Sequence, residues 1–300
     1  MKTADLIGLG KITKHYTEGL ENSNFLNLCA VSDVNPNSVS RELYSSLPFF
    51  ADYKDMISSA KPDFAIISTP PESHFEIAKF CLESNINVII EKPVVLNIDE
   101  FDALRSLAKE KGLKFITLFH WQGGIELERF NSVYNTDDIK EICVSIFDPY
   151  SDDEKTINTN SRALMGAWID SGVNALSMIK MWLPFKTFEI IKTNSVKCLE
   201  TNLPIYAFAE LLIDGVHVKI SVDWRHHKNS KESYITLSNK KVYINHSGQS
   251  LSDNTGSVSL AKRERLTEHY YKLFSRLDGK ENTESSRLIH KVLLEVNNAL

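Results

Sequence analysis

Short apolar runs alternate with amphipathic segments along the first 118 residues. The apolar runs are typical of strands buried in a parallel sheet, and they occupy residues 4–7, 26–31, 64–67, 88–90 and 115–118. Helical patterns lie between them at residues 11–20, at 75–82 and from Asn97 to Gly112, where Asn97 and Glu100 form a capping-box pattern. This alternation predicts right-handed βαβ units and a parallel sheet covered by helices on both faces.

The pattern changes after Phe119. One or two helices precede a long strand at 139–147, a polar loop at 148–161 and a helix at about 167–182. Later strands follow one another without intervening helices, at residues 188–193, 206–213, 216–222, 234–237 and 241–244. Helical patterns at 266–277 and 286–300 end the chain. We therefore expect an N-terminal, doubly wound parallel-sheet domain (residues 1–118) and a C-terminal α+β domain built on a mostly antiparallel sheet (residues 119–300).

The composition is that of a soluble globular protein, with 42% hydrophobic and 24% charged residues. A net charge of -5 provides no overall basic surface for nucleic acid or anionic membranes. No signal-peptide pattern or membrane-spanning apolar run is present, and the cysteines contain no CxxC pair. We therefore expect a cytoplasmic protein with reduced thiols and without a metal site.

A glycine-rich segment, Gly8-Leu9-Gly10-Lys11-Ile12-Thr13, follows the first predicted strand and precedes a helix. In a dinucleotide-binding turn, the first glycine allows the tight turn and the second lets backbone N–H groups approach a pyrophosphate. The third glycine serves mainly helix–strand packing, and Thr13 stands in its place here. This placement predicts a dinucleotide site that includes Gly8, Gly10, Lys11 and Ile12.

Asp33 ends the second predicted strand, 25 residues after Gly8. A carboxylate at this point hydrogen-bonds the ribose hydroxyl groups of a dinucleotide and repels a 2′-phosphate. The sequence therefore predicts NAD rather than NADP as the cofactor. The alternative is that Asp33 simply caps a turn with Asn35 and Pro36.

Glu91 and Lys92 follow the apolar run at 88–90, and Pro93 ends that strand because proline cannot continue a sheet ladder. Ligands in open α/β sheets bind beyond the carboxyl ends of the strands. Lys92 is therefore a candidate catalytic residue. The alternative is a lysine that is merely solvated at a strand end.

Three segments together resemble one family: Gly8-Leu9-Gly10-Lys11-Ile12, Ser68-Thr69-Pro70-Pro71-Glu72-Ser73-His74 and Glu91-Lys92-Pro93. Their order and spacing are similar to those of the glucose–fructose oxidoreductase, inositol dehydrogenase and rhizopine-catabolism family (Gfo/Idh/MocA). The resemblance implies a Rossmann domain that binds NAD(P) and a cofactor channel lined by Ser68, Thr69, Pro70 and His74. It also implies that Glu91 and Lys92 reach the nicotinamide and the substrate, and that the peptide bond before Pro93 is cis.

The segment from Asp170 to Ser177 resembles the family pattern D-x-G-x-H-x-x-D, with Asn174 in place of the histidine. Residues 170 and 174 are one helical turn apart, so both side chains can project from one face, although a solvated polar stripe is the alternative. Asparagine cannot be a general base near neutral pH. Proton removal would then rest on Asp170, on Lys92 or on both, with Asn174 orienting the hydroxyl group.

The same segment, together with Asp223-Trp224-Arg225, is similar to a subgroup that oxidises aldoses at C1, such as galactose and arabinose 1-dehydrogenases. This narrower resemblance implies oxidation of an aldopyranose to its lactone. Trp224 would offer an apolar face to the sugar, or would be a core aromatic residue. His120, at the end of the last strand of the first domain, would touch the substrate or have a structural role, and the structural role is favoured.

Two other functions stay open: a dehydrogenase that acts on another ring hydroxyl group, of an inositol or an amino sugar, and a non-catalytic sensor that binds the cofactor. The expected partner is a small sugar molecule. The exposed face of an antiparallel sheet predicts a homo-oligomer, a dimer or tetramer, formed through the C-terminal sheet. An enzymatic role depends on Lys92 and Asp170, from separate domains, acting on the same alcohol.

Overall fold

The computed structural model describes residues 1–300 and every side chain except that of Asn160. The chain divides into two compact units, the first made of residues 1–123 and 266–287, and the second of residues 124–265 and 288–300. The first boundary lies close to the expected one at residue 118. Residues 266–287 differ from the expectation, because they belong to the first unit rather than the second.

The first unit contains a sheet of six strands, all of them parallel. Their order is β3-β2-β1-β4-β5-β6. Successive strands are added on one side of β1 up to β3 and on its other side from β4 onward, as in a doubly wound fold. The strands are β1 (Lys2–Ile7), β2 (Leu26–Ser32), β3 (Phe49–Phe50), β4 (Phe64–Ile67), β5 (Asn87–Glu91) and β6 (Phe115–Leu118). The predicted parallel sheet is therefore confirmed, and β3 is a short edge strand that the pattern does not predict.

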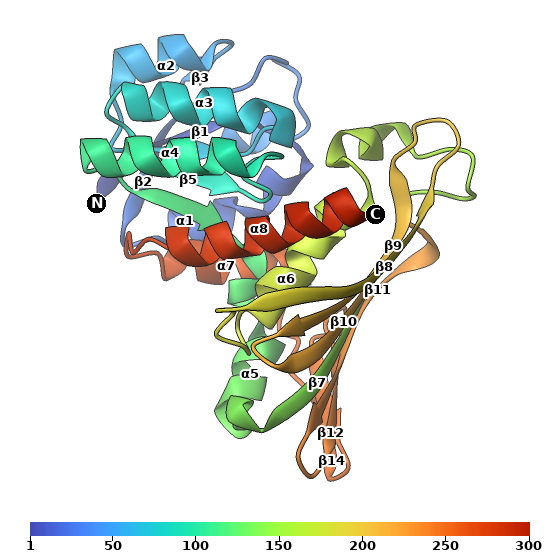
Figure 1. Cartoon of the computed structure of the whole chain (residues 1–300). Helices are drawn as coiled ribbons and strands as arrows, with labels where there is room; N and C mark the ends of the chain where they lie inside the picture. Colours follow the sequence, from blue (N-terminus) through green and yellow to red (C-terminus); the bar gives the residue numbers. More distant parts are fainter. The chain divides into compact units, whose positions relative to one another are not determined.

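Helices cover both faces of this sheet. Three lie in a row against one face (Figure 1): α2 (Tyr53–Ala60), α3 (Pro71–Glu83) and α4 (Ile98–Lys111). The other face packs against α1 (Thr17–Glu21) and α7 (Arg265–Ser275). Tyr270 and Phe274 of α7 are completely buried in that second cluster, which is why this late helix belongs to the first unit.

Local hydrogen bonds explain where two of these helices begin and end. The side chain of Asn97 accepts a hydrogen bond from the Asp99 N–H, which caps α4, and Gly112 ends the helix with φ +68°. The expected helix at 11–20 is instead split into a 3-10 helix, η1 (Lys11–His15), and α1. The Thr13 hydroxyl donates to the Gly10 carbonyl oxygen, and such local bonds compete with a regular helix.

The second unit is built on an eight-stranded sheet in the order β14-β13-β12-β11-β7-β10-β9-β8. Neighbouring strands are antiparallel except for the parallel pair β7 and β10. The strands are β7 (Ile139–Pro149), β8 (Phe188–Lys197), β9 (Pro204–Ile213), β10 (Val216–Asp223), β11 (Arg225–Leu237), β12 (Lys241–Asn245), β13 (Ser250–Asp253) and β14 (Gly256–Ser259). The predicted mostly antiparallel sheet is confirmed, with β13 and β14 as additional strands.

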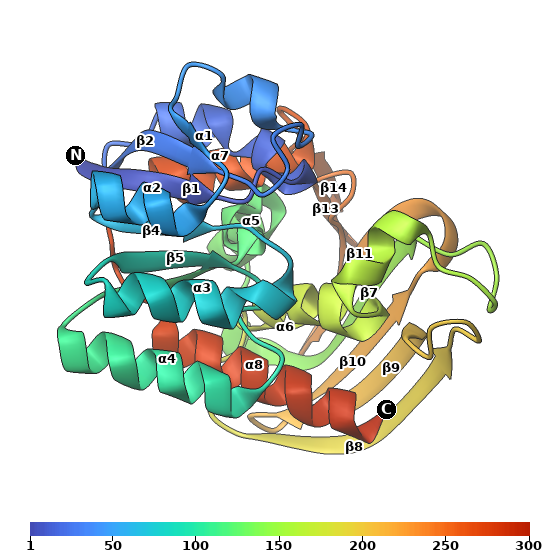
Figure 2. The ribbon, with the colours of Figure 1, turned by 90° about the horizontal axis from the view of Figure 1, so that it is seen from above.

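Helical segments complete the second unit. They are α5 (Ile125–Val133), a π-helical turn (Trp168–Gly172), α6 (Val173–Ile179) and the later part of α8 (Thr283–Ala299). All of α6 is buried, and it lies against the sheet at β7 (Figure 2). Within the described part of the chain, no helix has the length and apolar character that a membrane span needs.

One carboxylate lies in the apolar interior of the first unit. Asp5, in the middle of β1, is completely buried, and neither of its oxygen atoms has a hydrogen-bond partner among the described side chains. Burial raises the pKa of Asp5 to about 6, because desolvation disfavours the ionised form. Burial and the nearby Asp5 charge also raise the pKa of the Cys81 thiol to about 12.

We expect Asp5→Asn to raise the free energy of unfolding by about 1–3 kcal/mol at about pH 8. The folded carboxyl group has a pKa of about 6 and the ordinary value is 3.8, so the wild type loses stability as the pH rises through this window. The advantage of the variant should therefore disappear below about pH 4. Urea unfolding at several pH values measures this difference, and an advantage that grew toward low pH would contradict it.

Candidate functional site

The turn after β1 contains two glycines, of which Gly8 is closely surrounded by protein atoms and Gly10 is not. Gly8 has φ +92°, and a Cβ atom there would lie 2.6 Å from the carbonyl oxygen of Ser68. Only glycine fits this conformation and this space. At Gly10 an added Cβ would meet nothing within 4 Å, so the backbone at the start of η1 borders open space. Such a turn fits the pyrophosphate of a dinucleotide.

Thr13 closes this turn in place of a third glycine. Its side chain is completely buried, and its hydroxyl donates to the Gly10 carbonyl oxygen at 2.8 Å. The Tyr44 hydroxyl donates to the Thr13 carbonyl oxygen at 2.6 Å. In the same 3-10 helix, Lys11 is exposed and Ile12 is partly buried. Thr13, in place of the third glycine, therefore supports the shape of the turn through these two hydrogen bonds.

The Asp33 side chain accepts hydrogen bonds both from the glycine-rich turn and from the turn that follows β2. One carboxylate oxygen accepts the Leu9 N–H at 2.7 Å, and the other accepts the Asn35 N–H at 2.8 Å. The capping role considered in the sequence analysis is therefore present. The negative charge nevertheless lies directly after β2, beside the turn that would bind the pyrophosphate, so its contact with a ribose stays a prediction.

His74 ties the Ser68–His74 segment to the Lys92–Pro93 corner. Its Nδ1 lies 2.9 Å from the Pro93 carbonyl oxygen, and its Nε2 lies 2.7 Å from the Thr69 carbonyl oxygen. Burial lowers the pKa of His74, and a neutral ring donates to one carbonyl group at a time. Pro70 precedes α3 as its N-cap residue. The Lys92–Pro93 peptide bond is cis, as the resemblance implies.

Two tyrosines hold the carboxylate of Glu91. The hydroxyl groups of Tyr16 and Tyr270 both donate to the same Glu91 oxygen, each at 2.6 Å, and the other oxygen accepts the Lys92 N–H at 3.1 Å. The Tyr16 hydroxyl also lies 3.2 Å from the Ser68 hydroxyl. Burial raises the pKa of Glu91, while these hydrogen bonds and the Lys92 charge oppose that rise. The carboxylate is thus engaged within the protein, and Lys92 is partly exposed.

The role of Tyr16 and Tyr270 is not evident from the sequence. Tyr270 lies 179 residues after Glu91 and within an amphipathic helix, where an aromatic residue is ordinarily part of the core. The two rings pack with centroids 4.7 Å apart. Only the return of α7 to the first unit brings Tyr270 to Glu91.

His120 is also buried in the first unit. Its Nδ1 lies 3.1 Å from Nδ1 of His269 on α7, and the two rings stack with centroids 5.4 Å apart. These contacts support the structural role that the sequence analysis favours. A contact of His120 with substrate stays a prediction.

In the second unit, Asp170 lies on the π-helical turn rather than on the regular helix expected at 167–182. The Trp168 Nε1–H donates to the Leu293 carbonyl oxygen at 2.9 Å, and a Cβ atom on Gly172 would lie 2.9 Å from the Trp168 ring. Asn174 is 8% exposed, and its amide donates to the Asp170 carbonyl oxygen at 3.1 Å. One of its two amide N–H groups therefore holds the backbone of Asp170, and the contact of Asn174 with a substrate hydroxyl group stays a prediction.

Trp224 corrects an expectation from the sequence. Its side chain is completely buried and packs edge-on against Tyr150, with centroids 5.4 Å apart and an interplanar angle of 77°. The Trp224 carbonyl oxygen accepts the N–H groups of Tyr150 and Ser151 at 3.0 and 2.9 Å. A buried indole has no face on which a sugar can stack, so Trp224 is the core aromatic residue of the alternative interpretation.

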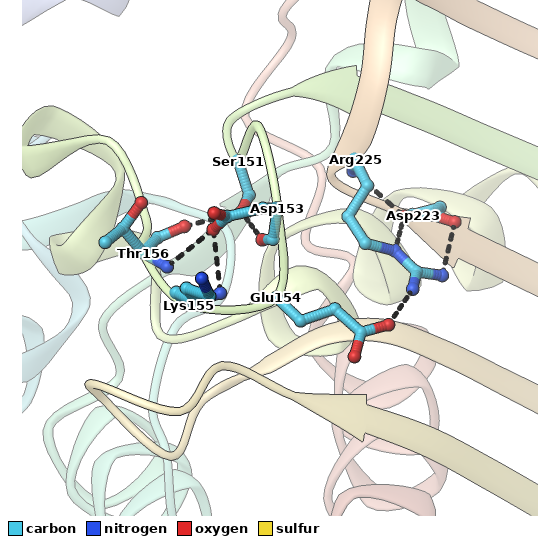
Figure 3. Close-up of polar contacts among 7 residues, drawn as sticks. All are labelled: Ser151, Asp153, Glu154, Lys155, Thr156, Asp223 and Arg225. Atoms are coloured by element: carbon cyan, nitrogen blue, oxygen red, sulfur yellow. Dashed lines mark hydrogen bonds and ion pairs between the residues drawn. The ribbon is translucent and has the colours of Figure 1, made fainter.

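Arg225 links the end of β10 to the loop that follows β7 (Figure 3). Its guanidinium group donates twice to Asp223, both at 3.0 Å, and once to Glu154 at 2.8 Å. In the same loop, one oxygen of Asp153 accepts the Thr156 N–H at 3.1 Å. These contacts pair the Arg225 charge with carboxylates of its own unit.

The histidine pair after Arg225 has no ligand cluster around it. His226 stacks on Phe147, with ring centroids 4.1 Å apart and an interplanar angle of 10°. Among the described residues, no three His, Cys, Asp or Glu side chains come together as the ligands of a metal ion would.

Comparison with known proteins connects the first unit to a family. Residues 3–119 match the family described as an oxidoreductase family with an NAD-binding Rossmann fold, Gfo/Idh/MocA. An uncharacterised oxidoreductase of Escherichia coli is 35% identical over 71 residues, which are 24% of this chain and 21% of that protein. Myo-inositol 2-dehydrogenase of Thermotoga maritima is 28% identical over 118 residues, which are 38% and 35% of the two chains. The matched parts thus span about a fifth and a third of these relatives.

Solved structures extend the likeness to the second unit. UDP-N-acetylglucosamine 3-dehydrogenase of Acidithiobacillus ferrooxidans superposes with a TM-score of 0.80 at 16% identity, over 100% of this chain and 97% of that one. At this identity the likeness concerns the fold. Residues 3–119 therefore match the NAD-binding Rossmann domain of the Gfo/Idh/MocA oxidoreductase family, and the chain as a whole shares the fold of that solved dehydrogenase.

Proposed function

We propose that the protein is an NAD-dependent oxidoreductase that oxidises a sugar hydroxyl group, namely C1 of an aldopyranose such as galactose or arabinose, to give the lactone. The position of Lys92 supports this proposal most directly. It follows β5 at the carboxyl edge of the parallel sheet, the edge where the turn of Gly8 and Gly10 also lies. Glu91 and His74 hold the backbone on either side of its side chain.

The protein's own groups divide the chemistry as follows. Gly8, Gly10 and Asp33 bind NAD, which supplies the hydride acceptor when bound. The Lys92 amine binds the sugar hydroxyl group and orients it. The Asp170 carboxylate accepts the hydroxyl proton, directly or through Lys92, as the C–H bond at C1 breaks and its electron pair leaves as hydride. Asn174 supports the Asp170 backbone through one amide N–H, and its second N–H and its amide oxygen orient the sugar hydroxyl group.

A second candidate is a dehydrogenase that acts on another ring hydroxyl group. The relatives favour it, since one is a myo-inositol 2-dehydrogenase and a protein of the same fold is a UDP-N-acetylglucosamine 3-dehydrogenase. The burial of Trp224 also removes one feature that favoured a stacked aldopyranose. Both candidates use the same lysine and carboxylate and differ only in which hydroxyl group is presented to them.

A substrate panel with NAD separates the candidates by the absorbance of NADH. We expect NADH to form with galactose or arabinose, whereas turnover of only myo-inositol or a nucleotide-linked amino sugar would establish the second candidate. Binding of NAD without turnover of any of these compounds would favour a sensor and overturn the proposal. The Michaelis constant should be lower for NAD than for NADP because of the Asp33 charge.

Replacement of Lys92 by methionine should lower kcat by about 10²–10⁴-fold, because the amine that orients and activates the hydroxyl group is lost. The dissociation constant of NAD, measured by fluorescence titration, should change by less than about twofold, since the Gly8–Gly10 turn is untouched. Lys109→Met, an exposed lysine in the last turn of α4, is the control. Unchanged turnover in Lys92→Met would remove Lys92 from the mechanism.

The two glycines of the turn should respond differently to alanine. Gly10→Ala meets no protein atom, so its melting temperature should match the wild type while NAD affinity falls about tenfold or more, because the methyl group occupies the approach of the pyrophosphate. Gly8→Ala should instead destabilise the protein by about 1–3 kcal/mol through its positive φ and the Ser68 carbonyl group. Calorimetric titration and thermal melts measure both effects. Full NAD affinity in Gly10→Ala would place the pyrophosphate elsewhere.

We also propose that the protein is a homo-oligomer formed through the outer face of the second unit's sheet. On β11, Ser233 and Ile235 are buried, whereas Tyr234 between them is 51% exposed and packs on Tyr243 of β12 at 4.9 Å between ring centroids. Ile191, on the edge strand β8, is 47% exposed. Exposed aromatic and aliphatic residues on a sheet favour contact with a second copy.

Tyr234→Glu should shift the molar mass in solution toward that of the monomer, because a carboxylate at the centre of the interface opposes its own symmetry mate. Light scattering coupled to gel filtration measures the mass. Leu199→Glu is the control, since Leu199 is 78% exposed but lies in a turn outside the sheet. A wild type that elutes as a monomer at micromolar concentration would contradict the proposed oligomer.

A further inference from the structure

A buried ion pair in the second unit has no part in the chemistry described above. Lys231 of β11 and Asp148 of β7 lie with Nζ and Oδ1 2.6 Å apart, and their side chains are only 8% and 6% exposed. The Lys231 ammonium also donates to the Asn229 side chain at 3.3 Å. The sequence analysis expects Asp148 in a polar loop, whereas it is the last inward-facing residue of β7. Its place among inward-facing apolar residues makes the carboxylate costly to bury.

The sheet is interrupted at this pair. Arg225 pairs with Pro149 and Ser230 with Phe147, so four residues of β11, 226–229, lie opposite Asp148 alone. Such a bulge breaks the ladder of hydrogen bonds and redirects the neighbouring side chains. The hydrogen-bond partners of the buried Asp148 carboxylate are side chains.

One of those side chains comes from the turn that carries Asp170. The Ser171 hydroxyl donates to the second oxygen of Asp148 at 3.3 Å, and Ser171 is 1% exposed. Lys231, Asp148 and Ser171 thus form a buried chain of hydrogen bonds from the sheet to the residue directly after Asp170. With the Trp168 bond to Leu293, the π-helical turn is attached to both the sheet and α8.

The charges around this chain include Asp170 itself. Burial lowers the pKa of Lys231, and the charge of Arg265 adds to this, while Asp148 and Asp170 oppose it. Burial also raises the pKa of the Tyr150 hydroxyl well above its usual value, and the charges of Asp170 and Asp148 raise it further. The carboxylate proposed to accept the proton therefore lies within electrostatic range of a buried amine.

We propose that Asp148 and Lys231 are a positioning pair that, through Ser171, fixes the π-helical turn on which Asp170 lies. This inference rests on the proposed function, in which Asp170 accepts the substrate proton. Stability alone is a poor reason to keep such a pair, because well-packed apolar residues are often at least as stable as a buried ion pair. A requirement for a fixed carboxylate is a sufficient reason, since small displacements of a reacting group slow a reaction steeply. Irregular π-type turns are also frequent at functional sites.

Ser171→Ala tests the link without changing any charge. It should lower kcat by about tenfold or more with the proposed sugar, while the Michaelis constant for NAD stays unchanged. Ser177→Ala is the matched control, because Ser177 is equally buried and its hydroxyl bonds only within the same helix, to the Asn174 carbonyl oxygen. Equal kcat values in Ser171→Ala and the wild type would overturn the link.

Lys231→Met and the double variant Asp148→Asn/Lys231→Met separate positioning from stability. The single variant leaves Asp148 buried without its cation, so its melting temperature should fall by roughly 5–15 °C. The double variant has no charge at either of these two positions, so it should recover most of the lost melting temperature. Its kcat should nevertheless stay at least about tenfold below that of the wild type. Lys240→Met, which breaks a half-buried pair with Asp253, is the control with unchanged kcat.

The outcomes separate the inference from the function on which it rests. A double variant with the wild-type melting temperature and the wild-type kcat overturns the positioning role and leaves the proposed function intact. A wild type that oxidises no sugar of the panel overturns the proposed function and the positioning role with it. Loss of kcat in both Ser171→Ala and the double variant, with both controls active, supports the pair as the anchor of Asp170.

Discussion

The cofactor side of the molecule depends on a carboxylate that is costly to bury. Glu91 is 5% exposed at the end of strand β5, and the two tyrosine hydroxyl groups on one of its oxygens offset part of its desolvation. Its other oxygen holds the Lys92 N–H. The partners come from opposite ends of the chain, so the first unit is complete only when α7 returns to it. A helix far from the Rossmann segment in sequence therefore belongs to the machinery that places Lys92.

The second unit also has a buried carboxylate near a residue with a proposed chemical role, but there that residue is an acid rather than a lysine. There the residue with a proposed chemical role is a carboxylate, Asp170, and the buried group beside it is a carboxylate neutralised by Lys231. In both units a buried acid near the end of a strand accepts a hydrogen bond close to a partly exposed ionisable side chain. Glu91 accepts the N–H of Lys92 itself, and Asp148 accepts the hydroxyl of Ser171, the residue after Asp170. Rigid scaffolds of this kind place a reacting group more exactly than surface loops do.

Local patterns account for most of the fold and for part of the site. Alternating apolar runs predict the parallel sheet, and the capping pattern at Asn97 predicts the start of α4. The cis bond before Pro93 is implied only by the family resemblance of the three motifs. Residues whose surroundings are set by distant segments escape such patterns. Tyr270 looks like an ordinary core aromatic, and nothing near Asp148 in sequence indicates Lys231, 83 residues away. The short polar strands β13 and β14, at one end of the second sheet, carry too little apolar pattern to be predicted.

Asn174 shows how one departure from the family pattern changes the chemistry. With its amide bonded to the Asp170 carbonyl oxygen, this residue supports the π-helical turn and takes no proton. Within the second unit, the proposed proton acceptor is therefore Asp170, whose charge acts on Lys231 and Tyr150. The buried Lys231 ammonium thus lies within electrostatic range of both Asp148 and the carboxylate that we propose as the proton acceptor.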